Sequence, residues 1–301
     1  MYSGFGVDTN ILMHDFSIKK IQDVQAGDIV LNEHKKPVTV KSNVEVFDNT
    51  FTIVPNDKGE QYNMCYNGRI VVRNKTTNVI EVKSIKDIIE QNNFCEGFDV
   101  NNYRLIRISL DFDEKETDIE PYFYGLYLAD NKSTATNEDR WEELKKIYRY
   151  NYEMSYVDNI PTNIILHDYI YNNTKKRLEL LAGIIDGCGL FESDTHCFEM
   201  RIKDENVANQ IVFLARSLGL GSGKRDLFSF NGSKIVKIFK VYIYGDIKVI
   251  PTKFLVIRTE SVKNYKEIEF SIYPNNMNKF YRLELDNGNR LISGGLDILS
   301  F

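Results

Sequence analysis

The chain has 301 residues, of which 43% are apolar, and this content is enough to fill the cores of one large domain or two modest domains. Global intrinsic disorder is therefore excluded. Its 38 basic and 43 acidic residues give a net charge of −5, so the chain as a whole lacks the positive charge of a strong non-specific nucleic-acid binder. Any DNA-binding function must therefore depend on a local basic patch.

The cysteine pattern and the absence of long apolar runs indicate in which cell compartment the protein is found. The four cysteines Cys65, Cys95, Cys188 and Cys197 form no Cys-x-x-Cys pair and do not resemble the disulfide framework of a small secreted domain. No apolar run reaches the roughly 18 to 20 residues that a membrane-spanning helix needs, and the first residues lack the features of a signal peptide. We expect a protein of the nucleus or cytoplasm that is not secreted and has no membrane partner.

The first part of the chain predicts a β domain. Short runs rich in β-branched residues, separated by turns, extend from Thr9 to Val46, and further runs occur at 51–54 and 70–72. Residues 84–91 predict a short helix. Residues 111–120 contain six acidic residues and one lysine, which indicates a solvated connector.

The middle of the chain predicts helices and strands together. We expect helices at 122–130, 137–149, 174–186 and 205–218, and strands at 197–202, 227–230 and 236–244. After about Ser261 short strands return, with a turn at 286–288. Because the two ends resemble each other more than either resembles the middle, we expect one β domain interrupted by an inserted α/β domain.

Two of the predicted helices contain small residues four positions apart, Gly125 with Ala129 and Gly183 with Gly187. Residues at this spacing lie on one helix face and allow two backbones to approach closely. The string LAGIIDGCG at 181–189 resembles the LAGLIDADG motif of homing endonucleases. A more degenerate first copy, FYGLYLAD, is found at 123–130.

The resemblance extends to both ends of the chain. Residues 9–30 and 280–292 resemble the first and last blocks of the intein protein-splicing (Hint) domain, and 159–161 and 214–220 resemble the flanks of the second motif. The chain thus resembles the intein-derived LAGLIDADG homing endonucleases, the family of the yeast vacuolar ATPase intein and the mating-type-switching endonuclease. The implied fold is α+β, with a mostly-β Hint-like domain formed by residues 1–110 and 262–301 and a LAGLIDADG-type α/β domain at 111–261.

The family resemblance also implies a catalytic centre. In the family, acidic residues at the ends of the two motif helices hold the divalent metal ions that hydrolyse both DNA strands. Asp130 occupies the first of these positions, Cys188 replaces the second Asp, and the backbone of Gly187 is a further candidate metal ligand. A thiol is a poor ligand for Mg²⁺, the cofactor expected if any nuclease activity remains. Asp186 lies about 200° around the helix from Cys188 and is expected to be structural.

Two further features bear on cleavage. Lys253 matches one catalytic lysine of the family, with an ordinary surface lysine as the alternative, whereas Asp158 stands where the other lysine would be. Only 49 residues, 131–179, separate the two motifs, so the first half of the DNA-binding saddle is expected to be truncated. Enzymatic activity as a LAGLIDADG DNA endonuclease is therefore uncertain, and we predict that cleavage is impaired or absent.

The local basic patch is predicted in the second half of the inserted domain. Residues 201–253 contain ten basic and four acidic residues, a net charge of +6, and such charge favours contacts to the phosphates of double-stranded DNA. A solvated sheet face is the alternative. The candidate DNA-binding residues are Arg201, Lys203, Lys224, Arg225, Lys234, Lys237 and Lys240. The two pseudo-symmetric motif helices predict a monomer.

The positions that protein splicing requires are lost. By comparison with the family, Gly4 replaces the nucleophile, Gly68 replaces a histidine, and Ser300 and Phe301 replace the terminal His-Asn pair. We therefore predict a stand-alone intein-like homing endonuclease homologue that cannot splice. The alternative is a non-catalytic DNA-binding or protein-interaction protein that retains the fold.

Overall fold

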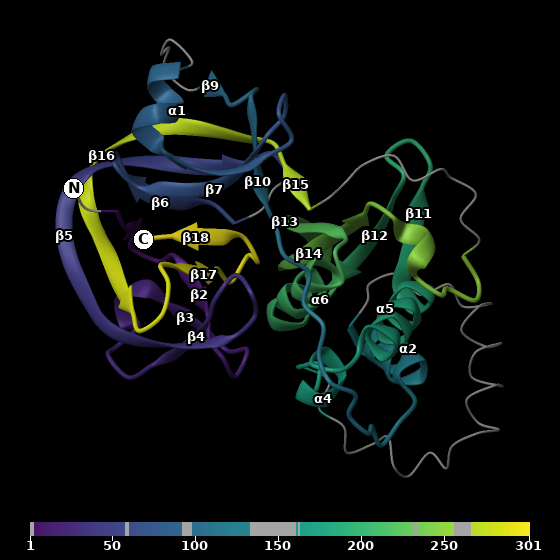
Figure 1. The fold of residues 1–301 in the computed structure, drawn as a ribbon. Helices are drawn as coiled ribbons and strands as arrows, with labels where there is room; N and C mark the ends of the chain where they lie inside the picture. Colours follow the sequence, from purple (N-terminus) through teal and green to yellow (C-terminus); the bar gives the residue numbers. More distant parts are fainter. Residues whose placement is uncertain are drawn as a thin grey trace. The chain divides into compact units, whose positions relative to one another are not determined.

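The computed structural model describes residues 3–57, 60–91, 98–132, 161, 163–231, 234–255 and 266–301. The chain divides into two compact units (Figure 1). Unit 1 comprises Met1–Ser109 and Tyr265–Phe301, and unit 2 comprises Leu110–Asn264. Unit 1 is therefore assembled from two segments that are far apart in the sequence.

The first sheet of unit 1 has the strand order β4-β5-β6-β1-β16-β9, and its pairs are antiparallel. Its two longest strands, β5 and β16, also pair with each other and form the long curved ribbon seen in Figure 1. Val38 and Val40 of β5 are buried on one face of the strand, as expected from the period of two. The strands are β1 (Phe5–Gly6), β4 (Ile29–Leu31), β5 (Pro37–Pro55), β6 (Tyr62–Cys65), β9 (Phe98–Asp99) and β16 (Phe270–Leu285).

The second sheet of unit 1 has the order β15-β10-β7-β18-β17, and β8 pairs with β7. A two-stranded sheet, β2 with β3, and one helix, α1, complete the unit. Ile70 and Val72 of β7 lie in the same hydrophobic core as residues of the first sheet. The elements are β2 (Asn10–Leu12), β3 (Ile18–Lys20), η1 (Ile21–Asp23), β7 (Arg69–Asn74), β8 (Ile80–Ser84), α1 (Ile85–Gln91), β10 (Tyr103–Ile106), β15 (Glu267–Ile268), β17 (Arg290–Ile292) and β18 (Ile298–Ser300).

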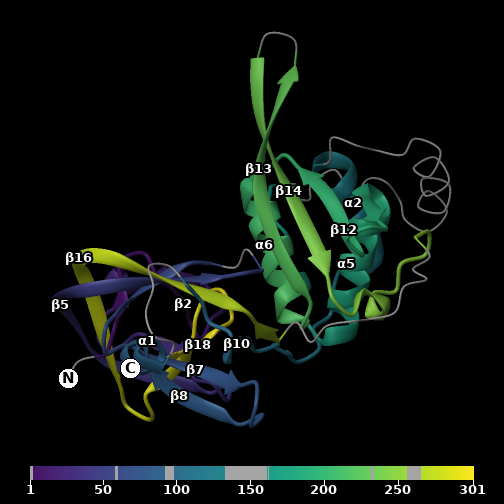
Figure 2. The same ribbon diagram turned by 90° about the horizontal axis from the view of Figure 1, so that it is seen from above.

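Unit 2 has a four-stranded antiparallel sheet of order β11-β12-β14-β13, with helices against one of its faces (Figure 2). Phe198, Met200 and Ile202 alternate along β12 and are buried in a core shared with the helices. The elements are α2 (Pro121–Lys132), α4 (His167–Ile170), α5 (Thr174–Cys188), β11 (Gly189–Glu192), β12 (Cys197–Ile202), α6 (Glu205–Ser217), β13 (Gly221–Asn231), β14 (Lys234–Tyr244) and η3 (Ile247–Val249).

Side-chain caps define where two of these helices begin. The Asn173 side chain accepts a hydrogen bond from the backbone N–H of Lys176 at the start of α5. The Asp204 carboxylate accepts from the N–H groups of Asn206 and Val207 at the start of α6. Such caps satisfy backbone donors that have no partner within the helix.

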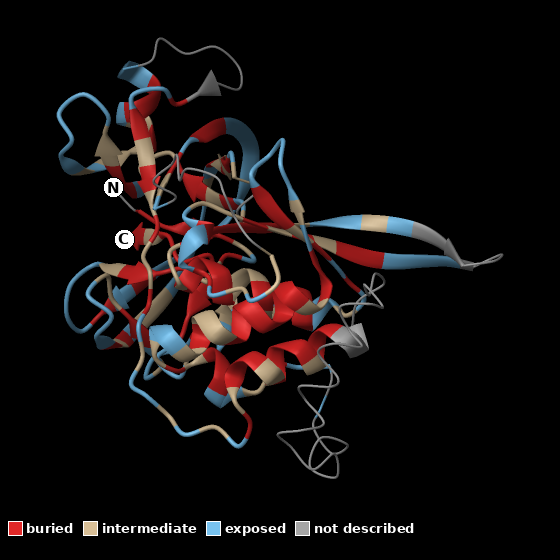
Figure 3. Ribbon diagram, turned by 90° about the vertical axis from the view of Figure 1, so that its right-hand side faces the viewer, coloured by how far each residue is buried: buried red, intermediate tan, exposed pale blue. Residues whose placement is uncertain are grey.

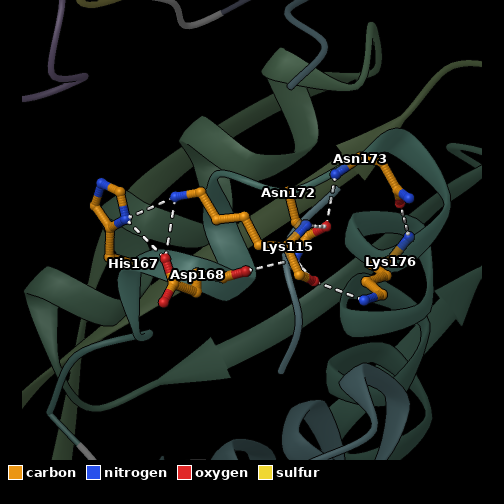
Figure 4. A network of polar contacts seen from close by, with 6 residues as sticks. All are labelled: Lys115, His167, Asp168, Asn172, Asn173 and Lys176. Carbon is orange, nitrogen blue, oxygen red and sulfur yellow. Dashed lines mark hydrogen bonds and ion pairs between the residues drawn. The ribbon is translucent and has the colours of Figure 1, made fainter. Parts of the chain in front are cut away.

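The acidic connector belongs to unit 2, and five of its six acidic residues are exposed, as the composition predicts, while its backbone is hydrogen-bonded to the rest of the unit. Asn172 is fully buried, and its side-chain amide accepts from the Lys115 N–H at 3.1 Å and donates to the Lys115 carbonyl at 3.0 Å (Figure 4). The Lys115 ammonium also bonds Asp168 at 3.0 Å, and the Lys176 ammonium donates to the Lys115 carbonyl at 2.6 Å. Most of these hydrogen bonds use backbone groups of the connector, and the charge of its side chains gives no indication of them.

Most of the predicted elements are confirmed, and the α+β class is confirmed with them. The helices expected at 84–91, 122–130, 174–186 and 205–218 are α1, α2, α5 and α6, and the strand expected at 197–202 is β12. The two strands β13 and β14 are both longer than predicted. The helix expected at 137–149 lies outside the described residues. Of the helices described, none is both long and apolar enough to span a bilayer.

Candidate functional site

The two motif helices, α2 and α5, pack so closely that side chains larger than hydrogen do not fit at several positions. A Cβ atom added at Gly183 would overlap the carbonyl oxygen of Tyr122, and one added at Gly187 would overlap the side chain of Ala129. Gly125 is crowded in the same way by the backbone of α5. Because Tyr122 lies beside Gly183 and Ala129 beside Gly187, the two helices run parallel and their C-terminal ends meet.

The parallel packing places the two predicted motif-end positions at neighbouring helix ends. Asp130 follows Ala129 in α2, and Cys188 follows Gly187 at the end of α5. Cys188 is buried, and its thiol donates a hydrogen bond to the Ile184 carbonyl, with the sulfur 3.3 Å from the oxygen. At Cys188, therefore, the motif end presents a thiol that is hydrogen-bonded to its own helix.

Asp186 is a structural centre of unit 2. Its carboxylate is fully buried and accepts a hydrogen bond from the Tyr122 hydroxyl at 2.9 Å and from the backbone N–H of Lys253 at 2.6 Å. The N–H groups of Phe254 and Leu255 also donate to it, at 3.4 and 3.3 Å. A buried carboxylate is stable when its oxygens are satisfied in this way. Asp186 therefore joins the start of α2, the end of α5 and the segment 253–255.

Lys253 lies where the beginning of α2 meets the segment held by Asp186. The Lys253 ammonium lies 3.7 Å from the centre of the Tyr122 ring and 5.4 Å from that of Phe123, at the beginning of α2. Asp130 is eight residues further along this helix, which corresponds to about 12 Å. The anchoring of its backbone by Asp186 and the attraction of the cation to the Tyr122 ring explain this position.

Glu120, which the sequence analysis did not single out, belongs to the same end of α2. Burial raises the pKa of its carboxyl group, while the nearby Lys253 ammonium acts in the opposite direction. One indication of such a cluster was present in the sequence, because Tyr122 and Asp186 lie near the ends of two helices that the motif predicts to be paired. Their contact depends on the helix register, which only the structure supplies.

The second motif helix does not fit a magnesium site formed by two carboxylates. Mg²⁺ requires oxygen ligands in near-octahedral geometry, whereas Cys188 offers a buried thiol and the Asp186 oxygens already accept hydrogen bonds from one hydroxyl and three backbone N–H groups. Among the described residues, no group of three or more His, Cys, Asp or Glu side chains could hold a metal ion.

The predicted basic patch is divided between the two faces of the four-stranded sheet. Arg201, Lys240 and Arg225 are direct cross-strand neighbours on β12, β14 and β13, and they lie on the face opposite the helices. Lys240 also forms an ion pair with Glu199 on the same face. This row of three cations is one continuous surface feature.

The other candidate DNA-binding lysines are not part of this row. Lys224 and Lys237 lie on the other face of the sheet, which the helices cover. Lys224 forms an ion pair with Glu205 at 2.6 Å, and Lys237 forms one with Asp226 at 2.9 Å. Lys203 follows β12, and Lys234 is the first residue of β14. The net charge of a sequence segment does not show which face of the sheet each side chain lies on. The residues predicted to form one patch therefore lie on two different surfaces.

The four positions at which we predict that splicing residues are lost, Gly4, Gly68, Ser300 and Phe301, lie together in unit 1. The Ser3 hydroxyl donates to the Ser300 carbonyl at 3.1 Å and accepts from the Arg69 N–H at 3.2 Å, beside Gly4 and Gly68. Ser300 and Phe301 are both buried.

The space for larger side chains at two of these positions is filled. A Cβ atom at Gly4 would overlap the ring of Phe280, and one at Gly68 would lie 2.8 Å from the Cys65 carbonyl oxygen. Neither position therefore accepts a larger side chain without displacing its neighbours.

Residues 165–242 match the family model described as homing endonuclease. The matched segment contains the second motif helix α5, the helix α6 and nearly all of the four-stranded sheet. The match confirms the predicted resemblance to homing endonucleases over these residues.

Comparisons with whole proteins give weaker similarities. No characterised protein matches the chain in sequence. A crystal structure of the G-1F mutant of the Ssp DnaB mini-intein variant M86 is similar with a TM-score of 0.36 and 7% identity, covering 100% of this chain and 99% of that one. A crystal structure of the gp41-1 intein is similar with a TM-score of 0.25 and 16% identity, covering 36% of this chain and 70% of that one.

A size exchange across the helix contact tests the packing of α2 on α5. We expect Gly187→Ala to lower the free energy of unfolding by about 1–3 kcal/mol, because the new methyl group overlaps Ala129. Adding Ala129→Gly to this variant removes the overlap and recovers at least ~0.5 kcal/mol beyond additivity. Urea denaturation of the four proteins of this cycle measures both quantities, and strictly additive effects would contradict the contact.

Proposed function

We propose that this chain is a stand-alone, intein-like homing endonuclease homologue in which unit 2 binds double-stranded DNA and unit 1 is the Hint-like domain. The observation that carries the proposal is the family match over residues 165–242, the segment that builds α5, α6 and the sheet. The proposed domains follow the sequence prediction, 1–110 with 262–301 for the Hint-like domain and 111–261 for the endonuclease-like domain.

The proposed DNA-binding surface is the face of the sheet opposite the helices. Arg201 and Arg225 are exposed on either side of Lys240, and neither arginine has an ion-pair partner among the described residues. Arginine side chains bind phosphate through several N–H donors, so this row supports contacts to a DNA backbone. Such contacts position the duplex and carry no sequence information by themselves.

We propose that cleavage is impaired or absent. Hydrolysis by the family depends on metal-binding carboxylates at both motif ends, and the Cys188 position supplies a thiol that is hydrogen-bonded to Ile184. The Lys253 ammonium lies over the Tyr122 ring, and its role as a catalytic lysine stays a prediction. These observations favour a DNA-binding protein that retains the fold with little or no nuclease activity.

We also propose that unit 1 does not splice. Gly4, Gly68, Ser300 and Phe301 offer no nucleophile, no histidine and no terminal asparagine. When the chain is embedded between two reporter proteins, we expect mass spectrometry to detect the unprocessed fusion alone. Ligated reporters in the same sample would disprove this expectation.

The DNA-binding proposal predicts a strong salt dependence. With three to five phosphate contacts, the affinity for mixed-sequence 30-base-pair duplexes is expected to fall by about 40- to 500-fold between 50 and 200 mM salt. Arg201→Gln and Arg225→Gln should each reduce the slope of log K against log salt by about one. Fluorescence anisotropy measures both effects.

Lys248→Gln is the matched control for this experiment, because Lys248 is an exposed cation outside the four-stranded sheet. Its slope should equal that of the unmodified protein. If the unmodified protein does not bind at 50 mM salt, the DNA-binding proposal is wrong and the protein-interaction alternative is favoured.

The cleavage proposal is tested with a supercoiled plasmid library in the presence of Mg²⁺ or Mn²⁺. We expect no linear product above that of an Asp130→Ala control, because only one of the two motif ends has an acidic residue. Agarose gel electrophoresis distinguishes the supercoiled, nicked and linear forms. Efficient formation of linear DNA that Asp130→Ala abolishes would show that the chain is an active nuclease.

A further inference from the structure

Strand β8 of unit 1 is an edge strand with exposed apolar side chains. Among the described residues, β8 pairs with β7 alone. Ile80 is 49% exposed and Val82 is 37% exposed, and both lie on the same face of the strand because side chains alternate. An edge strand of this kind can pair with a strand of another chain.

The hydrogen bonds at the two ends of the β7–β8 ladder show which backbone groups of β8 point outward. The Asn74 N–H donates to the Val79 carbonyl at 2.9 Å, and the Ile85 N–H donates to the Gly68 carbonyl at 2.9 Å. In an antiparallel pair, every second residue directs its N–H and C=O groups to the partner strand. The odd-numbered residues of β8 therefore bond β7, and the N–H and C=O groups of the even-numbered residues point away from it.

The even-numbered residues of β8 are Ile80, Val82 and Ser84. The Ser84 N–H donates to the Asp87 carboxylate at 3.2 Å, which agrees with its outward direction. The groups that a further strand would meet are thus the N–H and C=O groups of Ile80 and Val82 and the carbonyl of Ser84.

The charges of β8 are self-complementary. Glu81 and Lys83 lie on either side of Val82 along the strand, on the face opposite its side chain, and form an ion pair at 2.9 Å. When two copies of β8 pair antiparallel about a two-fold axis at Val82, Glu81 of each copy lies opposite Lys83 of the other. An axis one residue earlier or later places like charges opposite each other, which destabilises a strand pair.

The same axis also suits the backbone and the apolar face. The N–H and C=O groups of Val82 bond those of Val82 in the other copy, and the Ile80 N–H bonds the Ser84 carbonyl. On the apolar face, the two Val82 side chains lie opposite each other, with Ile80 as the diagonal neighbour.

A longer edge strand, β13, does not have this property. It is the last strand of the sheet of unit 2, and its hairpin with β14 projects from that sheet (Figure 3). An axis at Arg225 would place Lys224 opposite Asp226, but the two Arg225 side chains would then lie opposite each other. The charge pattern therefore favours β8 over β13 as a contact between two copies.

We infer that two copies of this chain associate through their β8 strands and form one continuous antiparallel sheet across a two-fold axis at Val82. Such an interface is isologous, because both copies contribute the same strand. The monomer predicted from the sequence concerns the motif helices of unit 2, whereas this contact uses unit 1 and does not depend on the proposed DNA binding. A strand of five residues buries less area than a standard interface, so the dimer forms at high protein concentration.

Charge reversal tests the register. Sedimentation velocity of the full chain between about 5 and 500 µM should show a reversible dimer. Glu81→Lys and Lys83→Glu each place like charges opposite each other at two positions, so each should raise the dissociation constant at least about tenfold. The double variant Glu81→Lys/Lys83→Glu and an equimolar mixture of the two single variants both restore opposite charges and should restore the dimer.

Two controls separate this contact from net charge and from folding. Lys248→Glu changes the net charge as much as Lys83→Glu does, but Lys248 lies in unit 2, so the dissociation constant should not change. The Lys83 ammonium also lies 5.7 Å from the centre of the Tyr103 ring. Circular dichroism therefore checks that each single variant is folded, and recovery of the dimer in the double variant shows that β8 is intact.

A disulfide tests the position of the axis. Residues in a hydrogen-bonded antiparallel pair have Cα atoms about 5.5 Å apart, which a disulfide can bridge. Under oxidising conditions, Val82→Cys should form a covalent dimer on a non-reducing gel. Val79→Cys, at a more exposed position that the register does not place opposite itself, should remain monomeric, as should the unmodified chain.

Three results would overturn the inference. A chain that stays monomeric at the highest concentration leaves the β8 edge to solvent or to a strand of another protein. A dimer that neither charge reversal weakens, or that the double variant and the mixture do not restore, forms through another surface. Cross-linking of Val79→Cys as fast as that of Val82→Cys would contradict the axis at Val82.

Discussion

The close approach of α2 and α5 is the constraint on which the rest of unit 2 depends. Glycine at positions 125, 183 and 187 brings backbone against backbone, and no larger residue fits without displacing a neighbour. This contact fixes the register in which the Tyr122 hydroxyl meets the Asp186 carboxylate. The same carboxylate accepts hydrogen bonds from the backbone of residues 253–255. The helix contact therefore also determines the position of this segment, which follows the last strand of the sheet.

Packing and chemistry have separate requirements in such a helix pair. The small residues and Asp186 serve the packing, and all of them are present. At position 188, where the family resemblance predicts a catalytic carboxylate, the chain has a thiol that is hydrogen-bonded within its own helix. Cys188 is buried in the core of unit 2, so the thiol is compatible with the packing of the helix pair.

The sequence predicted the helices and the family well, because both depend on local patterns. The 3.6-residue period and the motif string located α2, α5 and α6. The candidate site was predicted less completely. The sequence does not state strand register, so it could not separate Lys224 and Lys237 from the row of Arg201, Lys240 and Arg225. It also could not place the Lys253 ammonium, whose position depends on a buried carboxylate in a distant helix.

Unit 1 is completed only by residues that follow unit 2 in the chain. Strand β16 pairs with β1 and β5, and β18 pairs with β7, so both sheets combine the two terminal segments. During folding, these pairings must close a loop of 155 residues, from 110 to 264, and loop closure costs more entropy as the loop lengthens. A folded unit 2 with its own core shortens the effective loop, because its internal contacts already restrict the chain. Closing the two sheets of unit 1 therefore costs less entropy when unit 2 has already folded.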